Sequence, residues 1–217
     1  MSTRPARPAP KLAAVRALWQ GNESRPRDRE RKREAVILTA ARAFRTRGYH
    51  NTSLEDIANE LKITKPTVYH YVTNKENLLF ECFRAGLAQI MTGFDEIRGS
   101  TASARDRLEH VIERYAEAIA SDFGWCMVQA ENQDLSPAMS AKVRALKSEI
   151  DQGLRRIIKE GQLDKSIRKC DAKITAFALA GALNWISYWY RSGEELAPAE
   201  VAKLFIDFFD LGLRPRT

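Results

Sequence analysis

The sequence predicts an all-α fold, and three observations support that prediction. From residue 26 onward almost every segment has apolar residues at i, i+3, i+4 and i+7, the period of a helix with one buried face. Ser, Thr, Asp or Asn, the residues that cap helix N-termini, precede most of these segments. The sequence contains no clear alternating strand pattern and no turn dipeptide between two apolar runs that would indicate a hairpin.

The first predicted helix carries Ile37, Ala40, Ala41 and Phe44 on one face, at i, i+3, i+4 and i+7. Gly48 follows this face and supplies a helix stop, because glycine readily adopts the left-handed conformation that ends helices. The first helix is therefore expected to end just before Gly48.

Two short helices follow the first. Ser53, with Asp56 three residues later, is predicted to cap a helix over 54–61. After a turn of three residues, Thr64 is predicted to cap a second helix over 65–71. These lengths match a helix-turn-helix, whose second helix enters the major groove of DNA.

The rest of the chain is predicted to form longer helices. Asn74 opens the first of them, and Gly161 is predicted to end the one that begins at Ser136-Pro137. The others begin at Ser103, Asp171 and Pro198.

Positive charge is concentrated in the first third of the chain. The net charge is +7. Residues 1–75 hold 16 Lys and Arg against 7 Asp and Glu (+9), which leaves 19 against 21 (−2) for residues 76–217. A basic module joined to a near-neutral one indicates a polyanionic partner, most commonly nucleic acid.

The densest basic run is Arg25–Arg33, which includes Arg29 and Arg33. It has three interpretations. It is an arm that follows DNA phosphates or the minor groove, or the leading turns of the first helix, or only a solvated charged face. Its position beside a helix-turn-helix favours a role in DNA binding.

The second helix of the predicted helix-turn-helix has exposed positions that suit contacts with base edges. They offer a cation, a hydroxyl, a phenol and an imidazole ring, while Val68 and Val72 face inward. The exposed residues are Lys65, Thr67, Tyr69 and His70.

Each of these residues also has a structural interpretation. The two tyrosines of this helix are then core aromatics, and Lys65 and Lys75 are ordinary surface lysines. Ser53 and Thr64 are helix caps first, although a capped helix N-terminus also binds a backbone phosphate through its free N–H groups.

Five strings of this region resemble the TetR family of one-component repressors: Ala41–Phe44, Arg47–Tyr49, Thr52–Ala58, Thr64–Tyr71 and Asn74–Leu79. The resemblance covers about residues 29–83, in motif order, spacing and helix caps. It implies an N-terminal three-helix helix-turn-helix domain and a C-terminal helical domain for ligand binding and dimerisation.

The resemblance also implies roles for single residues. Lys65, Thr67, Tyr69 and His70 fall where the family touches DNA, and Lys75 falls on its phosphate-binding lysine. The chain departs from the family in two places.

Lys62 stands in the turn where the family often has Gly, and it costs on the order of 1 kcal/mol if that turn needs a positive φ. Val72 stands where Phe is frequent. Both departures are expected to affect which operator is read.

The second half of the chain carries a dense aromatic segment, which predicts either an effector pocket with a few polar anchors or a core or dimer interface. The candidate ligand-binding residues are Phe123, Trp125, Asn184, Trp185, Tyr188, Trp189 and Arg191. The end of this segment resembles a subset of the family that answers acyl-CoA thioesters; a small planar aromatic compound is the competing effector.

A homodimer is expected, because one helix-turn-helix buries little surface and two half-sites multiply affinity. In the family the last two helices of each protomer pair into a four-helix interface. By that resemblance, Ala180 and Gly181 allow close approach and Phe205, Phe208 and Phe209 supply anchors.

Other classes of protein fit the sequence poorly. The histidines lack metal-ligand spacing, and the sequence contains no nucleophile elbow, no phosphate-binding Gly loop and no His-Glu-x-x-His motif, so neither an enzyme nor a metal or cofactor site is expected. A non-specific architectural DNA-binding protein would not need the near-neutral second domain. Cys82, Cys126 and Cys170 fit reduced thiols of a cytoplasmic protein, and Ile174–Tyr190 is too short and too polar for a membrane span.

We therefore expect a mobile basic tail over 1–24, a DNA-binding domain over 25–75 and a ligand-binding and dimerisation domain over 76–217. The predicted protein is a dimeric transcription regulator. It would repress from a palindromic double-stranded operator until a small hydrophobic effector releases it.

Overall fold

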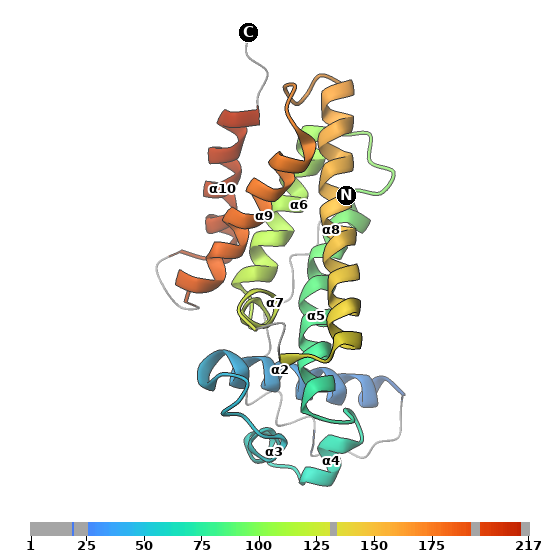
Figure 1. Ribbon diagram of the computed structural model, residues 1–217, viewed down its shortest axis with the longest axis vertical. Coiled ribbons are helices and arrows are strands. Elements are labelled where there is room, and N and C mark those ends of the chain that lie inside the picture. The colour runs from blue at the N-terminus through green and yellow to red at the C-terminus, as the bar shows by residue number, and fades with distance from the viewer. Residues whose placement is uncertain (1–18, 20–25, 131–133, 192–195, 214–217) are drawn as a thin grey trace.

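The computed structural model describes Trp19 and residues 26–130, 134–191 and 196–213, and over these residues it contains nine α-helices and no strand (Figure 1). The predicted all-α fold is confirmed. The predicted tail over 1–24 lies outside the described residues except for Trp19, whose ring meets that of Tyr71 edge-on at a centroid distance of 5.6 Å. Trp19 thus contacts the N-terminal domain.

The N-terminal domain consists of α2 (Pro26–Arg47), α3 (Leu54–Leu61) and α4 (Lys65–Tyr69). The three helices lie at one end of the molecule, the lower end in Figure 1. Gly48 follows α2 with a φ of +81°, so the predicted helix stop is confirmed.

The predicted cap of α3 is also present, whereas α4 is shorter than predicted. The Ser53 hydroxyl accepts a hydrogen bond from the Asp56 N–H at 3.1 Å, and the Asp56 carboxylate accepts one from the Ser53 N–H at 2.7 Å. The N–H groups of His70 and Tyr71 bond to carbonyls three residues earlier, at 3.3 and 3.0 Å. This tightening ends the regular helix at Tyr69 rather than at residue 71.

The C-terminal domain is an elongated bundle that rises from the N-terminal domain (Figure 1). A short helix, α7, lies between the bundle and α2. The helices are α5 (Lys75–Glu96), α6 (Ala104–Ala120), α7 (Gly124–Val128), α8 (Pro137–Leu163), α9 (Ala172–Trp189) and α10 (Pro198–Leu213).

Two features of this bundle differ from the sequence prediction. The helix α7 was not predicted, because its five residues are too few to show a helical period. The helix α8 continues past Gly161 to Leu163. Gly161 is buried, and a β-carbon there would lie 2.5 Å from Cδ1 of Ile167. Its role is therefore close packing and not helix termination.

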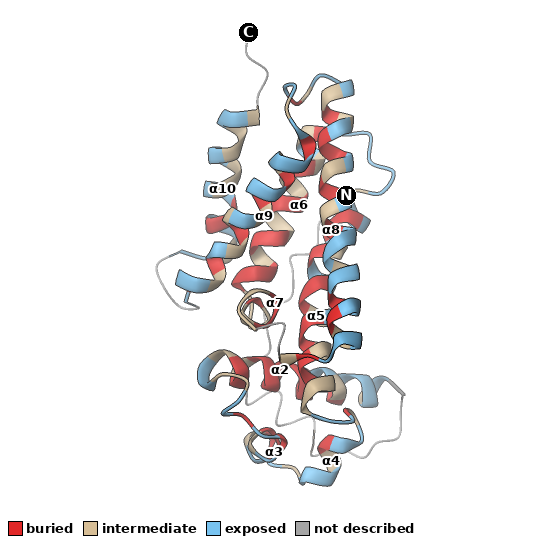
Figure 2. Cartoon of the chain, viewed as in Figure 1, coloured by how far each residue is buried: buried red, intermediate tan, exposed pale blue. Residues whose placement is uncertain are grey.

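The chain has two apolar cores, visible as the buried segments in Figure 2, and α5 contributes to both. Leu78, Leu79 and Phe83, near the beginning of α5, pack with α2, α3 and α4, whereas Leu87 and Ile90 pack into the bundle. The first turns of α5 thus complete the core of the N-terminal domain. One continuous helix therefore joins the two cores.

Candidate nucleic-acid interface

The helix α4 has one buried and one solvent-facing side. Val68 and Val72, which are 0% and 2% exposed, pack into the N-terminal core as predicted. The residues predicted to contact bases lie toward solvent: Lys65, Tyr69 and His70 are exposed and Thr67 is half-buried. Tyr69 has 49% of its surface accessible, so its phenol ring is available to a partner.

The turn between α3 and α4 depends on a left-handed backbone at Lys62. This residue has φ 59° and ψ 43°, and its N–H donates to the carbonyls of Ala58 and Asn59. The Ile63 N–H donates to the Ala58 carbonyl at 3.0 Å, so that the end of α3 is satisfied. The positive φ suspected from the sequence is present, at a cost of roughly 1–2 kcal/mol for an L residue.

Local contacts hold the first turn of α4. Thr64 occupies the N-cap position, but its hydroxyl lies 2.8 Å from the Thr67 hydroxyl and does not bond a backbone amide. The Lys65 ammonium lies 3.6 Å from a Glu55 carboxylate oxygen, and both side chains are exposed. Because an exposed ion pair contributes little, the Lys65 charge is available to DNA.

Lys75 is the first residue of α5 and is held by the connection between α2 and α3. Its Nζ donates to the His50 carbonyl at 3.3 Å and lies 4.3 Å from the centroid of the Tyr49 ring. Burial lowers the pKa of Lys75, and the carboxylates of Asp134 and Asp56 oppose that shift. The His50 ring nitrogen lies 2.9 Å from Asp134, so a residue before α8 also supports this site.

The basic run forms the leading turns of α2, one of the three interpretations of its sequence; Arg25 itself lies outside the described residues. Arg29 is exposed. Arg33 is directed to α5, where its guanidinium lies 2.7 Å from Glu81 and the two side chains are 24% and 12% exposed. The predicted contact of Arg33 with DNA stays a prediction, and the pair with Glu81 would compete with it.

Two arginines of α2 connect the DNA-binding domain to the bundle. Arg42 Nε donates to the Asp122 carboxylate at 2.7 Å, in the connection between α6 and α7. Arg45 donates to the Tyr190 carbonyl at 3.1 Å, directly after α9. No sequence pattern predicted these contacts, because the partners are 80 and 145 residues apart.

The residues predicted to bind an effector are not brought together in one cavity. Trp185 and Tyr188 stack at a centroid distance of 4.8 Å on the outer face of α9, where they are 61% and 45% exposed. Trp189 is exposed as well. Asn184 accepts a hydrogen bond from the Tyr115 hydroxyl at 3.2 Å, and burial raises the pKa of Tyr115 to about 12. Of the others, Phe123 and Trp125 are half-buried against the N-terminal core, and Arg191 is exposed and donates to backbone carbonyls.

Exposed apolar side chains gather instead on α9 and α10. Phe208 is 70% exposed, and Gly181 has nothing within 4 Å of an added β-carbon. Three further residues of the predicted interface are partly buried and pack against the bundle core below this face: Ala180, Phe205 and Phe209. The other large apolar residues exposed on the two helices are Ile174, Phe177, Trp185, Tyr188, Trp189, Leu204 and Leu211. An exposed apolar face of this kind indicates an interaction surface.

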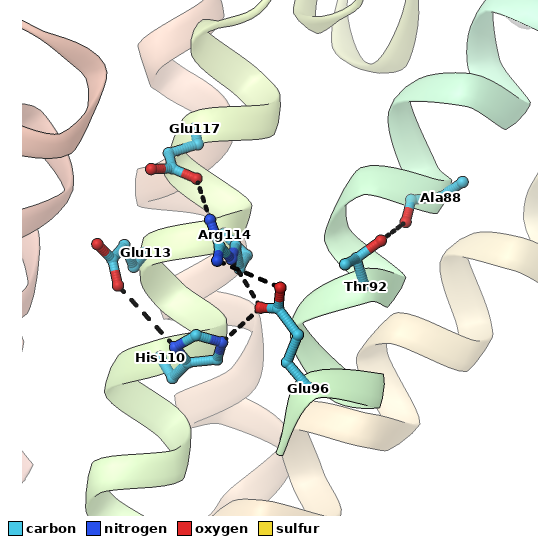
Figure 3. A network of polar contacts seen from close by, with 7 residues as sticks. All are labelled: Ala88, Thr92, Glu96, His110, Glu113, Arg114 and Glu117. Carbon is cyan, nitrogen blue, oxygen red and sulfur yellow. Dashed lines mark hydrogen bonds and ion pairs between the residues drawn. The ribbon is translucent and has the colours of Figure 1, made fainter. Parts of the chain in front are cut away.

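A polar network joins α5 to α6 at the surface of the bundle (Figure 3). Arg114 donates to both carboxylate oxygens of Glu96, at 2.8 and 3.2 Å, and to Glu117 at 3.0 Å. A His110 ring nitrogen lies 2.7 Å from Glu96. Burial raises the pKa of Glu96, but hydrogen bonds from Arg114 and His110 outweigh it and leave that pKa below its ordinary value. The network links the end of α5 to the middle of α6.

Two further findings concern the residues that the structure describes. No group of three or more His, Cys, Asp or Glu side chains there is arranged to hold a metal ion. Within the same part of the chain, no helix has the length and apolar character needed to cross a membrane.

Comparisons with known proteins match both halves of the chain. Residues 36–82 match the family model described as bacterial regulatory proteins, tetR family, and residues 101–213 match the tetracyclin repressor-like C-terminal domain. The transcriptional repressor KstR2 of Rhodococcus jostii is 27% identical over 185 residues, which cover 84% of this chain and 91% of that protein.

Solved structures show the same arrangement of helices. The TetR family regulator PfmR of Thermus thermophilus is similar with a TM-score of 0.73 and 26% identity, over 80% of this chain and 95% of that one. AibR, in complex with isovaleryl coenzyme A and operator DNA, is similar in fold with a TM-score of 0.69 and 24% identity, over 81% of this chain and 96% of that one.

Proposed function

The chain belongs to the TetR family of bacterial transcriptional regulators, since one family model alone matches residues 101–213 of its 217, and on this premise we propose that it is a dimeric repressor. In the absence of effector, two helix-turn-helix domains hold a palindromic operator. A small hydrophobic effector bound by the C-terminal domain then favours a dimer geometry in which the two α4 helices no longer match the half-site spacing.

The observation that carries this proposal is the exposed face of α4 over a buried valine anchor. The anchor fixes how far α4 projects, and its first turn then presents Lys65, Thr67 and Tyr69 to a major groove. Lys75, at the N-terminus of α5, would contact a backbone phosphate and set the register of the domain on the duplex.

Contacts between the two domains support release by an effector. The bond from Arg45 to the Tyr190 carbonyl and the pair of Arg42 with Asp122 join α2 to the C-terminal ends of α9 and α6. An effector shifts the equilibrium between two dimer geometries only by its different affinity for them. These contacts are where a change in the bundle would alter the orientation of α2.

The effector class is proposed from relatives. KstR2 is named a transcriptional repressor, and AibR was solved with isovaleryl coenzyme A and operator DNA together. An acyl-CoA thioester is accordingly the first effector to test, and a small planar aromatic compound is the second. We assign the protein to the cytoplasm, where such an operator lies, and assign it no catalytic activity.

The experiment begins with selection of genomic DNA fragments by the purified protein at physiological salt. An enriched inverted repeat supports dimeric operator binding, and acyl-CoA and aromatic pools are then tested for release of that fragment in a mobility-shift assay. Release by one pool supports the proposed switch. Retention of the operator against every pool would count against effector release and leave operator binding intact.

The alternative is a non-specific architectural DNA-binding protein that uses its basic N-terminal third. It predicts recovery that follows fragment length, together with a steep loss of affinity as salt rises. The two family-model matches, which extend over most of the near-neutral domain, do not favour it.

A further inference from the structure

A cavity of about 430 Å³ lies between α5, α6 and α8. Of these helices, α5 and α8 lie on the side of the bundle away from α10, whereas α6 packs against α10 (Figure 1). The floor of the cavity is apolar and contains Met91, Phe94 and Ile157. Phe94 and Ile157 belong to the bundle core and are 9% and 2% exposed. The volume falls in the range of roughly 300–1,000 Å³ that small-molecule sites occupy.

Arginines on the rim of this cavity have unused hydrogen-bond donors. Arg156 lines the cavity and is exposed, and no ion pair or hydrogen bond joins it to another residue in the described part of the chain. Arg107 pairs with Glu160 at 2.8 Å, but its Nε is buried and has no acceptor among the described residues. Because buried donors are nearly always satisfied, an orphan donor in a cavity wall indicates a missing partner.

The acidic groups of the rim leave room for an anion near Arg156. Glu160 is already paired with Arg107, and Asp95 lies 2.6 Å from Arg98. Glu149 is seven residues before Arg156 on α8, which places it two turns and about 10 Å away along the helix axis. The positive end of the cavity is therefore the end at Arg156 and Arg107.

A glycine shapes the apolar floor. A β-carbon at Gly153 would lie 2.5 Å from Cε1 of Phe94. The absence of a side chain at Gly153 lets the Phe94 ring lie directly on α8, between the cavity and the bundle core. Phe94 therefore lines the cavity and also belongs to the bundle core, in the same apolar cluster as Ile90 and Leu154.

We propose that this cavity binds an amphiphilic organic anion. Its apolar chain or ring lies on Met91, Phe94 and Ile157, and its carboxylate or phosphate accepts hydrogen bonds from Arg156 and from the Nε of Arg107. The inference rests on the proposed function for its regulatory role, and it moves effector recognition from the aromatic residues of α9 to the cavity between α5, α6 and α8.

The test is calorimetric titration of the full-length protein with three probes: decanoate, decanoyl-CoA and free coenzyme A. Decanoate and decanoyl-CoA are expected to bind, and free coenzyme A much more weakly. Arg156→Ala removes a charge-assisted hydrogen bond and is expected to weaken binding of the anionic amphiphile about tenfold or more. Tighter binding of decanoate or of decanoyl-CoA distinguishes a carboxylate from a phosphate headgroup.

Arg144→Ala is the matched control, because Arg144 is also an exposed arginine of α8 and does not line the cavity. It is expected to bind the probes like the wild type. In wild type and Arg156→Ala alike, each methylene added to the probe is expected to tighten binding by up to about fourfold, since the apolar floor is unchanged. Thermal unfolding checks that both variants remain folded.

Equal affinities of wild type and Arg156→Ala, or equal weakening by Arg144→Ala, would overturn this site. If no probe binds a wild-type protein that still binds its operator, the ligand chemistry is wrong while the proposed DNA binding stands. If the probes bind through Arg156 but leave the operator complex intact, the site stands and effector release by this class of ligand fails.

Discussion

Replacement of Lys62 by glycine is expected to stabilise the protein. Lys62 holds a left-handed conformation, φ 59° and ψ 43°, at the turn between α3 and α4. Its side chain is exposed, and no hydrogen bond or ion pair within the described residues involves it. The substitution therefore removes backbone strain without removing a contact of the folded state.

The size of the effect follows from two opposing terms. An L residue loses roughly 1–2 kcal/mol in this conformation, and glycine avoids that cost. Glycine gives back about 0.5–1 kcal/mol through the greater freedom of the unfolded chain. The net gain in the free energy of unfolding lies between about 0 and 1.5 kcal/mol, and its midpoint of about 0.75 kcal/mol corresponds to about 1.5–3 °C in Tm for a chain of this length.

The assay is thermal unfolding followed by circular dichroism, at one fixed protein concentration because dimerisation changes the apparent Tm. Lys62→Ala is the matched control. It removes the lysine side chain beyond the β-carbon, as glycine does, but keeps the β-carbon that causes the strain. It should unfold near the wild-type temperature. A Tm for Lys62→Gly at or below that of Lys62→Ala would refute the reasoning.

Three further predictions follow from the described contacts. Tyr69→Ala should weaken operator binding about tenfold without lowering the Tm, because the side chain is exposed; wild-type affinity in a mobility-shift assay would remove Tyr69 from the interface. Phe208→Glu should shift the protein from dimer to monomer in analytical ultracentrifugation, because it places a charge on the exposed apolar face of α10; an unchanged dimer would locate the interface elsewhere. Hydrogen bonds from Ser53 lower the pKa of Asp56 below its ordinary value of 3.8, so this carboxylate stabilises the fold above that value and loses the effect as pH falls through its lowered pKa. The Tm deficit of Asp56→Asn should therefore be present at neutral pH and shrink toward pH 3, and a pH-independent deficit would contradict this.

The fold was predictable where local chemistry decides it. Ser53 and Gly48 mark helix boundaries through their own side-chain or backbone chemistry, and both predictions are confirmed. The end of α4 was not predictable, because the tightening after Tyr69 involves Tyr71, whose ring packs on the distant Trp19. The prediction that Gly161 ends its helix was wrong for a related reason. Its packing partner, Ile167, lies beyond the end of α8, and only the turn after the helix brings it against Gly161.

The candidate site likewise contains features that the sequence could predict and features that it could not. A helical period shows that Trp185 and Tyr188 share a face, but it does not show whether that face points into the bundle or out of it. The pair of Arg33 with Glu81 and the bond from Arg45 to Tyr190 join segments that only the tertiary fold brings together. The exposure of Lys65 and Tyr69 and the burial of Val68 could be predicted because one short helix carries all three.

The central claim is that the exposed face of α4 reads DNA in both halves of a dimer, and selection from a random-sequence DNA library tests it most directly. The wild type and Thr67→Ala should be selected in parallel at physiological salt. The account predicts an inverted repeat for the wild type, and for the variant a preference that changes at the same base position in both halves. An identical motif for the two proteins, or no motif for the wild type, would contradict it.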